Sequence, residues 1–133
     1  KTLPGLGILD VTTQGGATRM IGPVVLDTAY GSVVGYENHS GATTLGSGQA
    51  AFGKVVAGFG NNGQDAMEGA QTGNVIGSYL HGPILPANPA LADHLIALAA
   101  ERATGRPFEP GVMDDRLADE AHARQVRRLT RAR

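Results

Sequence analysis

The chain has 133 residues with 11 basic and 12 acidic side chains, so its formal charge of −1 excludes a general electrostatic attraction to nucleic acid or anionic membranes. Hydrophobic residues make up 41% of the chain and aromatic residues 5%, which predicts one domain with a core of valine, leucine, isoleucine and alanine. Cysteine is absent, which excludes disulfides and thiolate metal sites. The longest apolar run, Leu95 to Ala100, is far shorter than the roughly 20 residues of a membrane-spanning helix.

Short β-branched runs separated by glycine fill the first 82 residues, which hold 18 of the 20 glycines. Five of these runs predict strands, at residues 7–13, 21–27, 32–36, 52–59 and 74–80. Glycine and asparagine adopt turn conformations at low cost, so we expect connections at Gly15-Gly16, Glu37 to Gly48 and Gly60 to Gly63. Strands followed by helices indicate an α/β protein, with fewer helices between strands than a doubly wound sheet has.

Two helices are predicted after this segment. Asn88-Pro89 is a good helix start and Gly105 a good stop, with Leu91, Leu95 and Leu98 on one face, so we expect a helix at 89–104. After a linker with Pro107 and Pro110, Asp114 or Asp115 can cap a last helix that runs to about Arg131. Its acidic residues come early and its arginines late, the order that suits a helix dipole.

A few polar residues stand at places where sites form. His81 follows a predicted strand and precedes Gly82-Pro83, an address typical of α/β sites, although a histidine that only bonds a loop carbonyl fits equally well. The stretch Asn38-His39-Ser40 would meet His81 if their strands were neighbours, and loop polarity explains it as well. Arg19, beside the expected Gly15-Gly16 turn, could receive a carboxylate or be merely solvated.

Several common sites are not encoded. The four histidines show no metal-ligand spacing, and the patterns GxxxxGK[ST] and GxSxG are absent. Arginines cluster at the C-terminal end without interleaved aromatics, so we expect a solvated or protein-docking helix outside any catalytic pocket. The cluster consists of Arg124, Arg127, Arg128, Arg131 and Arg133.

Five motifs occur in a distinctive order: GLGILD from Gly5, GYENHSG from Gly35, GFGNN from Gly58, Glu68-Gly69, and GSYLHGPILP from Gly77. In order and spacing they resemble the cobyric-acid-synthase-like class I glutamine amidotransferases, from about residue 4 to Pro110 and more loosely beyond. The resemblance implies an α/β chain that is the C-terminal half of a flavodoxin-like amidotransferase domain, strand-rich, with a helix at 89–104 and a C-terminal helix. Residues 1–110 would belong to that domain, and residues 111–133 would form the arginine-rich helix.

The resemblance also implies an activity. In this family a cysteine thiolate attacks the side-chain amide of glutamine, and a histidine serves as its base and then protonates the departing ammonia. His81 matches the catalytic histidine and Arg19 matches an arginine that recognises glutamine. Asn38 and Ser40 lie in a segment similar to a loop that lines the glutamine pocket. The resemblance implies no metal and no cofactor on this chain.

Two departures from the family pattern concern the catalytic groups. The family's cysteine lies upstream of the Gly5 motif, and this chain has no cysteine, so we expect that the first half of the catalytic domain is missing and that the chain alone is inactive. The start at Lys1 rather than methionine fits this expectation, and the oxyanion hole would be lost with the missing half. Many members also place a glutamate two residues after the histidine, where this chain has Pro83. We expect a partner subunit to supply that acid.

The implied partner is a Mur-ligase-like subunit that uses ATP and Mg²⁺ to activate a glutamate carboxyl in the stem peptide of lipid II. Ammonia would then amidate it during peptidoglycan synthesis in the cytoplasm, with L-glutamine as the donor and without nucleic acid or a membrane span. One alternative is amidation of a corrinoid side chain in cobalamin synthesis, which the Asn38 pattern and the HGPILP segment disfavour. Another alternative is a non-catalytic docking module that kept the fold and lost its cysteine.

Overall fold

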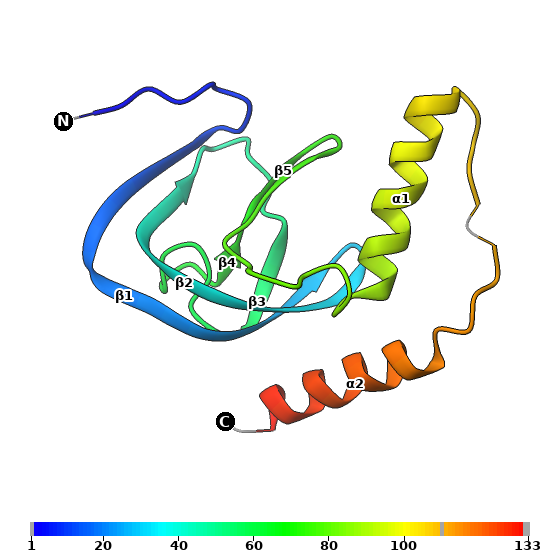
Figure 1. Cartoon of the computed structure of the whole chain (residues 1–133). Helices are drawn as coiled ribbons and strands as arrows, with labels where there is room; N and C mark the ends of the chain where they lie inside the picture. The colour runs from blue at the N-terminus through cyan, green and yellow to red at the C-terminus, as the bar shows by residue number, and fades with distance from the viewer. Residues whose placement is uncertain (1, 110, 132–133) are drawn as a thin grey trace.

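A long antiparallel hairpin organises the structure, a computed structural model that describes residues 2–109 and 111–131. Its strands are β1 (Val11–Thr28) and β2 (Gly31–Leu45), which curve side by side through the molecule (Figure 1). Pro110, at the expected domain boundary, and the terminal residues Lys1 and Arg133 lie outside the described residues.

Four shorter strands accompany the hairpin. β3 (Gly53–Ala57) and β4 (Met67–Glu68) extend the sheet in the order β2-β1-β3-β4, and β5 (Ala70–Thr72) and β6 (Val75–Gly77) form a separate small hairpin. Each of these pairs in the described part of the chain is antiparallel. The mixed α/β class is confirmed, but these residues show none of the parallel pairing that a flavodoxin-like sheet has. Parallel strands need long crossovers, whereas β1 and β2 are joined by a short turn.

The predicted bounds of the strands were wrong for both β1 and β2. β1 begins only at Val11, and Gly15-Gly16 is not a turn but part of an irregularity in which residues 16–19 of β1 face Ser40 alone in β2. β2 continues to Leu45 through most of the stretch expected to be a loop. Pairing with β1 satisfies the backbone of this glycine-rich stretch, and this tertiary gain outweighs its weak local preference for a strand.

The hairpin buries apolar side chains on both of its faces. The inner face of β1 and β2, defined by Val24, Leu26 and Val33, packs against Phe52, Leu80 and Leu91. The outer face, defined by the directly paired Val25 and Val34, packs with Ala57 against Val126 and Leu129 of the last helix. Alternate residues of a strand lie on opposite faces, so these two clusters fix which hairpin side chains remain exposed.

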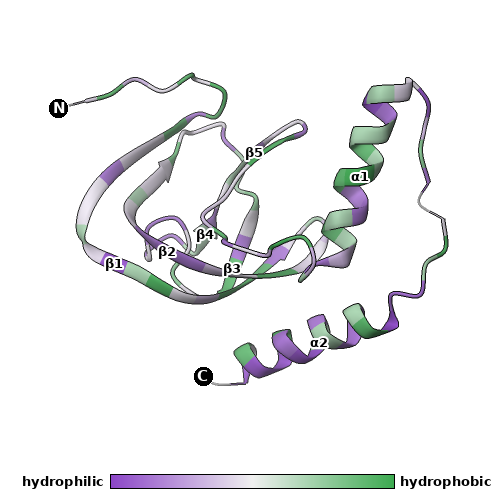
Figure 2. Ribbon diagram, in the orientation of Figure 1, coloured by the Kyte–Doolittle hydropathy of each residue, from purple (hydrophilic) through white to green (hydrophobic). Residues whose placement is uncertain are grey.

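Two helices complete the fold, at the positions expected from the sequence. α1 (Pro89–Thr104) ends at Gly105 in the left-handed conformation with a φ of 67°, and α2 (Arg116–Thr130) follows Asp115. Figure 2 shows that α2 is mainly hydrophilic, with a few apolar positions along it. In the described residues neither helix is long and apolar enough to cross a membrane.

Candidate active site

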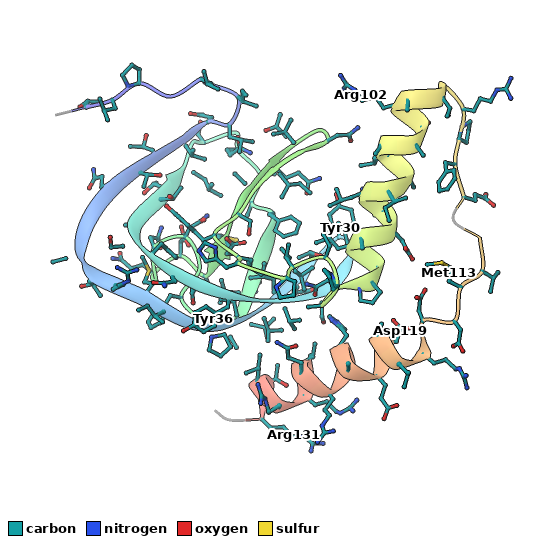
Figure 3. The ribbon with its side chains drawn as sticks, in the orientation of Figure 1. Tyr30, Tyr36, Arg102, Met113, Asp119 and Arg131 are labelled. Carbon is teal, nitrogen blue, oxygen red and sulfur yellow. The ribbon has the colours of Figure 1, made fainter. Side chains whose placement is uncertain are left out.

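The outer face of the hairpin beyond α2 carries the residues that the sequence singled out. Tyr36, Asn38 and Ser40 alternate with the buried Glu37 and His39 along β2, so the first three share the outer face. On β1 the directly opposite residues are Pro23 for Tyr36 and Ile21 for Asn38. Figure 3 shows the labelled Tyr36 projecting from the sheet on the side on which α2 lies.

His81 joins this face from a separate segment. It lies beyond the end of β6 at Gly77, so the strand expected up to Leu80 is shorter than predicted. The His81 N–H donates to the carbonyl oxygen of Tyr36 at 2.7 Å, and the two residues form an isolated antiparallel bridge. Residues paired in this way share a face, which places the exposed His81 beside Tyr36 on the outer face.

Arg19 and Asn38 are brought together at the irregular end of the hairpin. The Arg19 Nε donates a hydrogen bond to Asn38 Oδ1 at 2.8 Å, and both side chains are exposed. Asn38 and Tyr36 are two residues apart on β2, so their Cα atoms lie about 7 Å apart along the strand. The guanidinium, the amide and the imidazole therefore line one short stretch of surface, and Ser40 faces the irregularity that contains Arg19.

A groove of about 570 Å³ runs between this surface and α2. Its lining includes His81 and Tyr36 on one side and Gln125 and Arg128 of α2 on the other. Arg128 thus lines the groove beside His81, whereas the expectation that the C-terminal arginines lie outside the catalytic pocket stays a prediction. The helix is held there because Val126 and Leu129 pack on Val25 and Val34, and because His122 Nδ1 hydrogen-bonds the carbonyl oxygen of Ala87 at 2.8 Å.

A buried polar cluster lies behind His81 on the inner face. Glu37 is fully buried and its carboxylate accepts hydrogen bonds from the N–H groups of Phe59 at 2.7 Å and Gly60 at 3.0 Å. His39 Nε2 lies 3.5 Å from Glu37 Oε2 and has no other polar partner, and the His39 ring stacks on Tyr79 with centroids 3.6 Å apart. His39 is therefore an inner-face residue and does not meet the candidate surface.

Glu68 is the second fully buried carboxylate. Its oxygens accept from the Tyr79 N–H at 2.7 Å and from the Ser78 hydroxyl at 3.1 and 3.2 Å. Burial raises the pKa of Glu68 to about 7, an effect that these hydrogen bonds oppose and the nearby charge of Glu37 increases. This carboxyl therefore changes its charge near neutral pH.

Neither Glu37 nor Glu68 is among the site residues that the sequence predicts. The sequence predicts a loop at Glu37, and both glutamates lie in motifs that carry the family resemblance. The sequence carries no apolar alternation that would mark Glu37 as buried, because the residues that follow it, Asn38, His39 and Ser40, are polar as well. In residues 2–109 and 111–131 no group of three or more histidine, aspartate or glutamate side chains is arranged to hold a metal ion.

Residues 1–89 match the CobB/CobQ-like glutamine amidotransferase domain. The chain belongs to this family. It is 44% identical over 125 residues to the lipid II isoglutaminyl synthase (glutamine-hydrolyzing) subunit GatD of Staphylococcus aureus strain N315, which covers 93% of this chain and 49% of that protein. It is 36% identical over 126 residues to the subunit of the same name from Streptococcus pneumoniae strain R6, covering 90% of this chain and 47% of that protein.

A cobyric acid synthase from Sphingopyxis alaskensis is 39% identical over 119 residues, covering 86% of this chain and 23% of that protein. The chain thus spans about half the length of the two GatD relatives and a smaller share of the cobyric acid synthase.

Proposed function

We propose that this chain is part of a glutamine amidotransferase that hydrolyses L-glutamine and supplies ammonia for amidation of a stem-peptide glutamate of lipid II. The observation that carries the proposal is the placement of Arg19, Asn38 and His81 on one exposed stretch of the outer face. An amino-acid substrate needs a cation for its α-carboxylate and an acid–base group near its reacting end. The identity with the GatD relatives supports the choice of acceptor.

The chemistry requires a thiol, which the 133 residues do not contain. A cysteine carried by further polypeptide would lose its proton to the His81 imidazole and form a bond to the side-chain carbonyl carbon of glutamine. The imidazolium would then protonate the leaving nitrogen, and the C–N bond would break to release ammonia. Water, activated by the same imidazole, would hydrolyse the thioester to glutamate and restore the thiol.

The surroundings of His81 support a catalytic site that a second polypeptide completes. Pro83 stands two residues after His81, and the described residues place no carboxylate in hydrogen-bond contact with the His81 ring. A Mur-ligase-like partner that binds ATP and Mg²⁺ would both activate the acceptor carboxyl and supply the orienting acid. Exposed apolar side chains beside the site, at Ile21 and Tyr36, suit contact with further protein. We place this assembly in the cytoplasm, where ATP is available.

The decisive experiment compares two acceptors. The intact amidotransferase, meaning this sequence together with the polypeptide that carries the cysteine, is incubated with its ligase partner, ATP, Mg²⁺ and glutamine. We expect amidated lipid II and a glutaminase rate that rises when the partner is added. Amidation of a corrinoid carboxyl instead of lipid II would favour the alternative function in cobalamin synthesis. The relative from Sphingopyxis alaskensis carries the corresponding name, cobyric acid synthase. Absence of any glutaminase activity would favour a docking module.

Arg19 is expected to bind the α-carboxylate of glutamine. Removing a charge-assisted hydrogen bond to a bound carboxylate costs about 1.5–3 kcal/mol. Arg19→Ala should therefore raise the KM for glutamine about tenfold or more in the intact enzyme, with a smaller effect on kcat. Steady-state kinetics check this, with Lys54→Ala, an exposed basic residue on β3, as the control. A KM for Arg19→Ala equal to that of the control would remove Arg19 from the substrate site.

A further inference from the structure

The segment that carries His81 has no regular secondary structure. β6 ends at Gly77, and residues 78–80 belong to neither a helix nor a strand. A catalytic imidazole works only when it is held in place, because a displacement of about 1 Å can cost a hundredfold in rate. The contacts that fix residues 78–80 are therefore relevant to the proposed chemistry.

One carboxylate makes most of these contacts. Glu68 accepts from the Tyr79 N–H at 2.7 Å and from the Ser78 hydroxyl, while Ser78 Oγ in turn accepts from the Leu80 N–H at 3.0 Å. A single buried group thus orders three successive residues directly before His81. The backbone N–H groups of Tyr79 and Leu80 thus have side-chain partners in place of the partners that a helix or sheet would supply.

The other contacts of the segment attach it to β2. The Tyr79 hydroxyl hydrogen-bonds Thr43 Oγ1 at 2.8 Å, and Leu80 is buried in the inner-face core against Gly35. A side-chain carbon on Gly35 would stand 2.9 Å from Leu80 Cβ, so the two segments approach closely because Gly35 has none. One residue further along the chain, the His81 N–H donates its hydrogen bond to the Tyr36 carbonyl oxygen. The anchor at Glu68 and the anchor on β2 together determine where the imidazole stands.

We propose that Glu68 is a positioning residue for His81: its carboxylate, by holding the Tyr79 N–H and the Ser78 hydroxyl, fixes the segment that presents the imidazole to glutamine. The inference rests on the proposed function, because it takes His81 as the acid–base group. Glu68 touches neither substrate nor the reacting atoms, and its effect passes through residues 78–80.

The charge of Glu68 gives this role a pH dependence. The carboxylate accepts all of its hydrogen bonds when ionised, whereas protonation turns one oxygen into a donor. Because burial raises the pKa of Glu68 to about 7, the anchor is complete above that pH and weakens as the pH falls through it. The titratable groups near this cluster are Glu37 and His39 on β2, the Tyr79 hydroxyl, and His81 itself.

The test compares Glu68→Gln with Glu37→Gln in the intact enzyme. Both side chains are fully buried and bind backbone N–H groups, but Glu37 holds Phe59 and Gly60 and not the His81 segment. We expect Glu68→Gln to lower kcat about 10- to 100-fold with KM within about twofold, and to make kcat less dependent on pH around 7. Glu37→Gln, measured per folded molecule, should keep kcat within about threefold.

A readout independent of activity separates this inference from the proposed function. The ring resonances of His81, followed by NMR, should shift or broaden in Glu68→Gln and not in Glu37→Gln. If they do so while His81→Ala hydrolyses glutamine at the wild-type rate, the positioning holds and the proposed function fails. Unchanged resonances with an unchanged kcat in Glu68→Gln overturn the positioning, as does an equal loss in Glu37→Gln.

A second variant covers the case in which Glu68→Gln does not fold. Ser78 is exposed overall, so Ser78→Ala should leave the fold intact while removing the hydroxyl that links Glu68 to the Leu80 N–H. The expected effect is a 3- to 10-fold lower kcat, roughly what the loss of one hydrogen bond produces, with the same direction of change in the His81 resonances. Wild-type kcat and unchanged resonances in Ser78→Ala would count against the proposal.

Discussion

Replacing His81 with alanine in the intact amidotransferase is expected to lower the rate of glutamine hydrolysis by roughly two to four orders of magnitude, the range for loss of a positioned acid–base group. The fold should survive, because His81 is exposed and its structural contact is made by its backbone N–H. The rate is measured as glutamate or ammonia release. The 133-residue chain by itself should release none, since it has no cysteine for His81 to activate.

A matched control for this variant is available on α1. His94 is half-buried and its ring lies 4.4 Å from that of Tyr30, away from the candidate surface. His94→Ala should therefore keep the rate of hydrolysis within a few-fold of wild type. Wild-type rates from His81→Ala, or appreciable glutaminase activity from the cysteine-free chain, would contradict the assigned role.

Glu37→Ala is expected to destabilise the fold by about 3–5 kcal/mol, the combined cost of two buried N–H groups left without a partner and of a cavity. It would leave the Phe59 and Gly60 N–H groups without their acceptor and open a cavity between β2 and the turn after β3. Urea unfolding of the intact protein measures the change. Glu101→Ala on the exposed side of α1 should shift the free energy of unfolding by less than about 0.5 kcal/mol. Similar unfolding curves for the two variants would refute this account.

The helices were predictable because their signals are local. α1 spans the expected residues 89–104, and Gly105 ends it as expected. The helix begins at Pro89 as expected, but not because the Asn88 side chain caps it. Asn88 makes no side-chain cap; its amide is buried and pairs with the N–H and C=O groups of Val34, at 2.7 and 2.8 Å. A tertiary pairing with β2 thus replaced the local hydrogen bond that the sequence pattern predicts.

The strands were less predictable because their pairing is not local. Nothing in the stretch from Glu37 to Leu45 shows that β1 continues beside it, and its glycines favour a loop when it is considered alone. For the same reason the sequence does not predict the hydrogen bond between Arg19 and Asn38, which forms where the irregular part of β1 passes β2. The roles of Arg19, Asn38, Ser40 and His81 remain predictions that the kinetics above address.

The division into residues 1–110 and 111–133 also remains a proposal, and the position of α2 gives it a practical meaning for protein engineering. The arginine-rich sequence of the tail predicts a solvated or protein-docking helix, and on that basis shortening the chain after Gly111 would leave the chemistry intact. In the fold its Gln125 and Arg128 form a wall of the groove beside His81, and Val126 and Leu129 cover two valines of the sheet. A truncated protein would lose that wall and expose Val25 and Val34 to solvent, so a deletion of α2 modifies the surroundings of the imidazole directly.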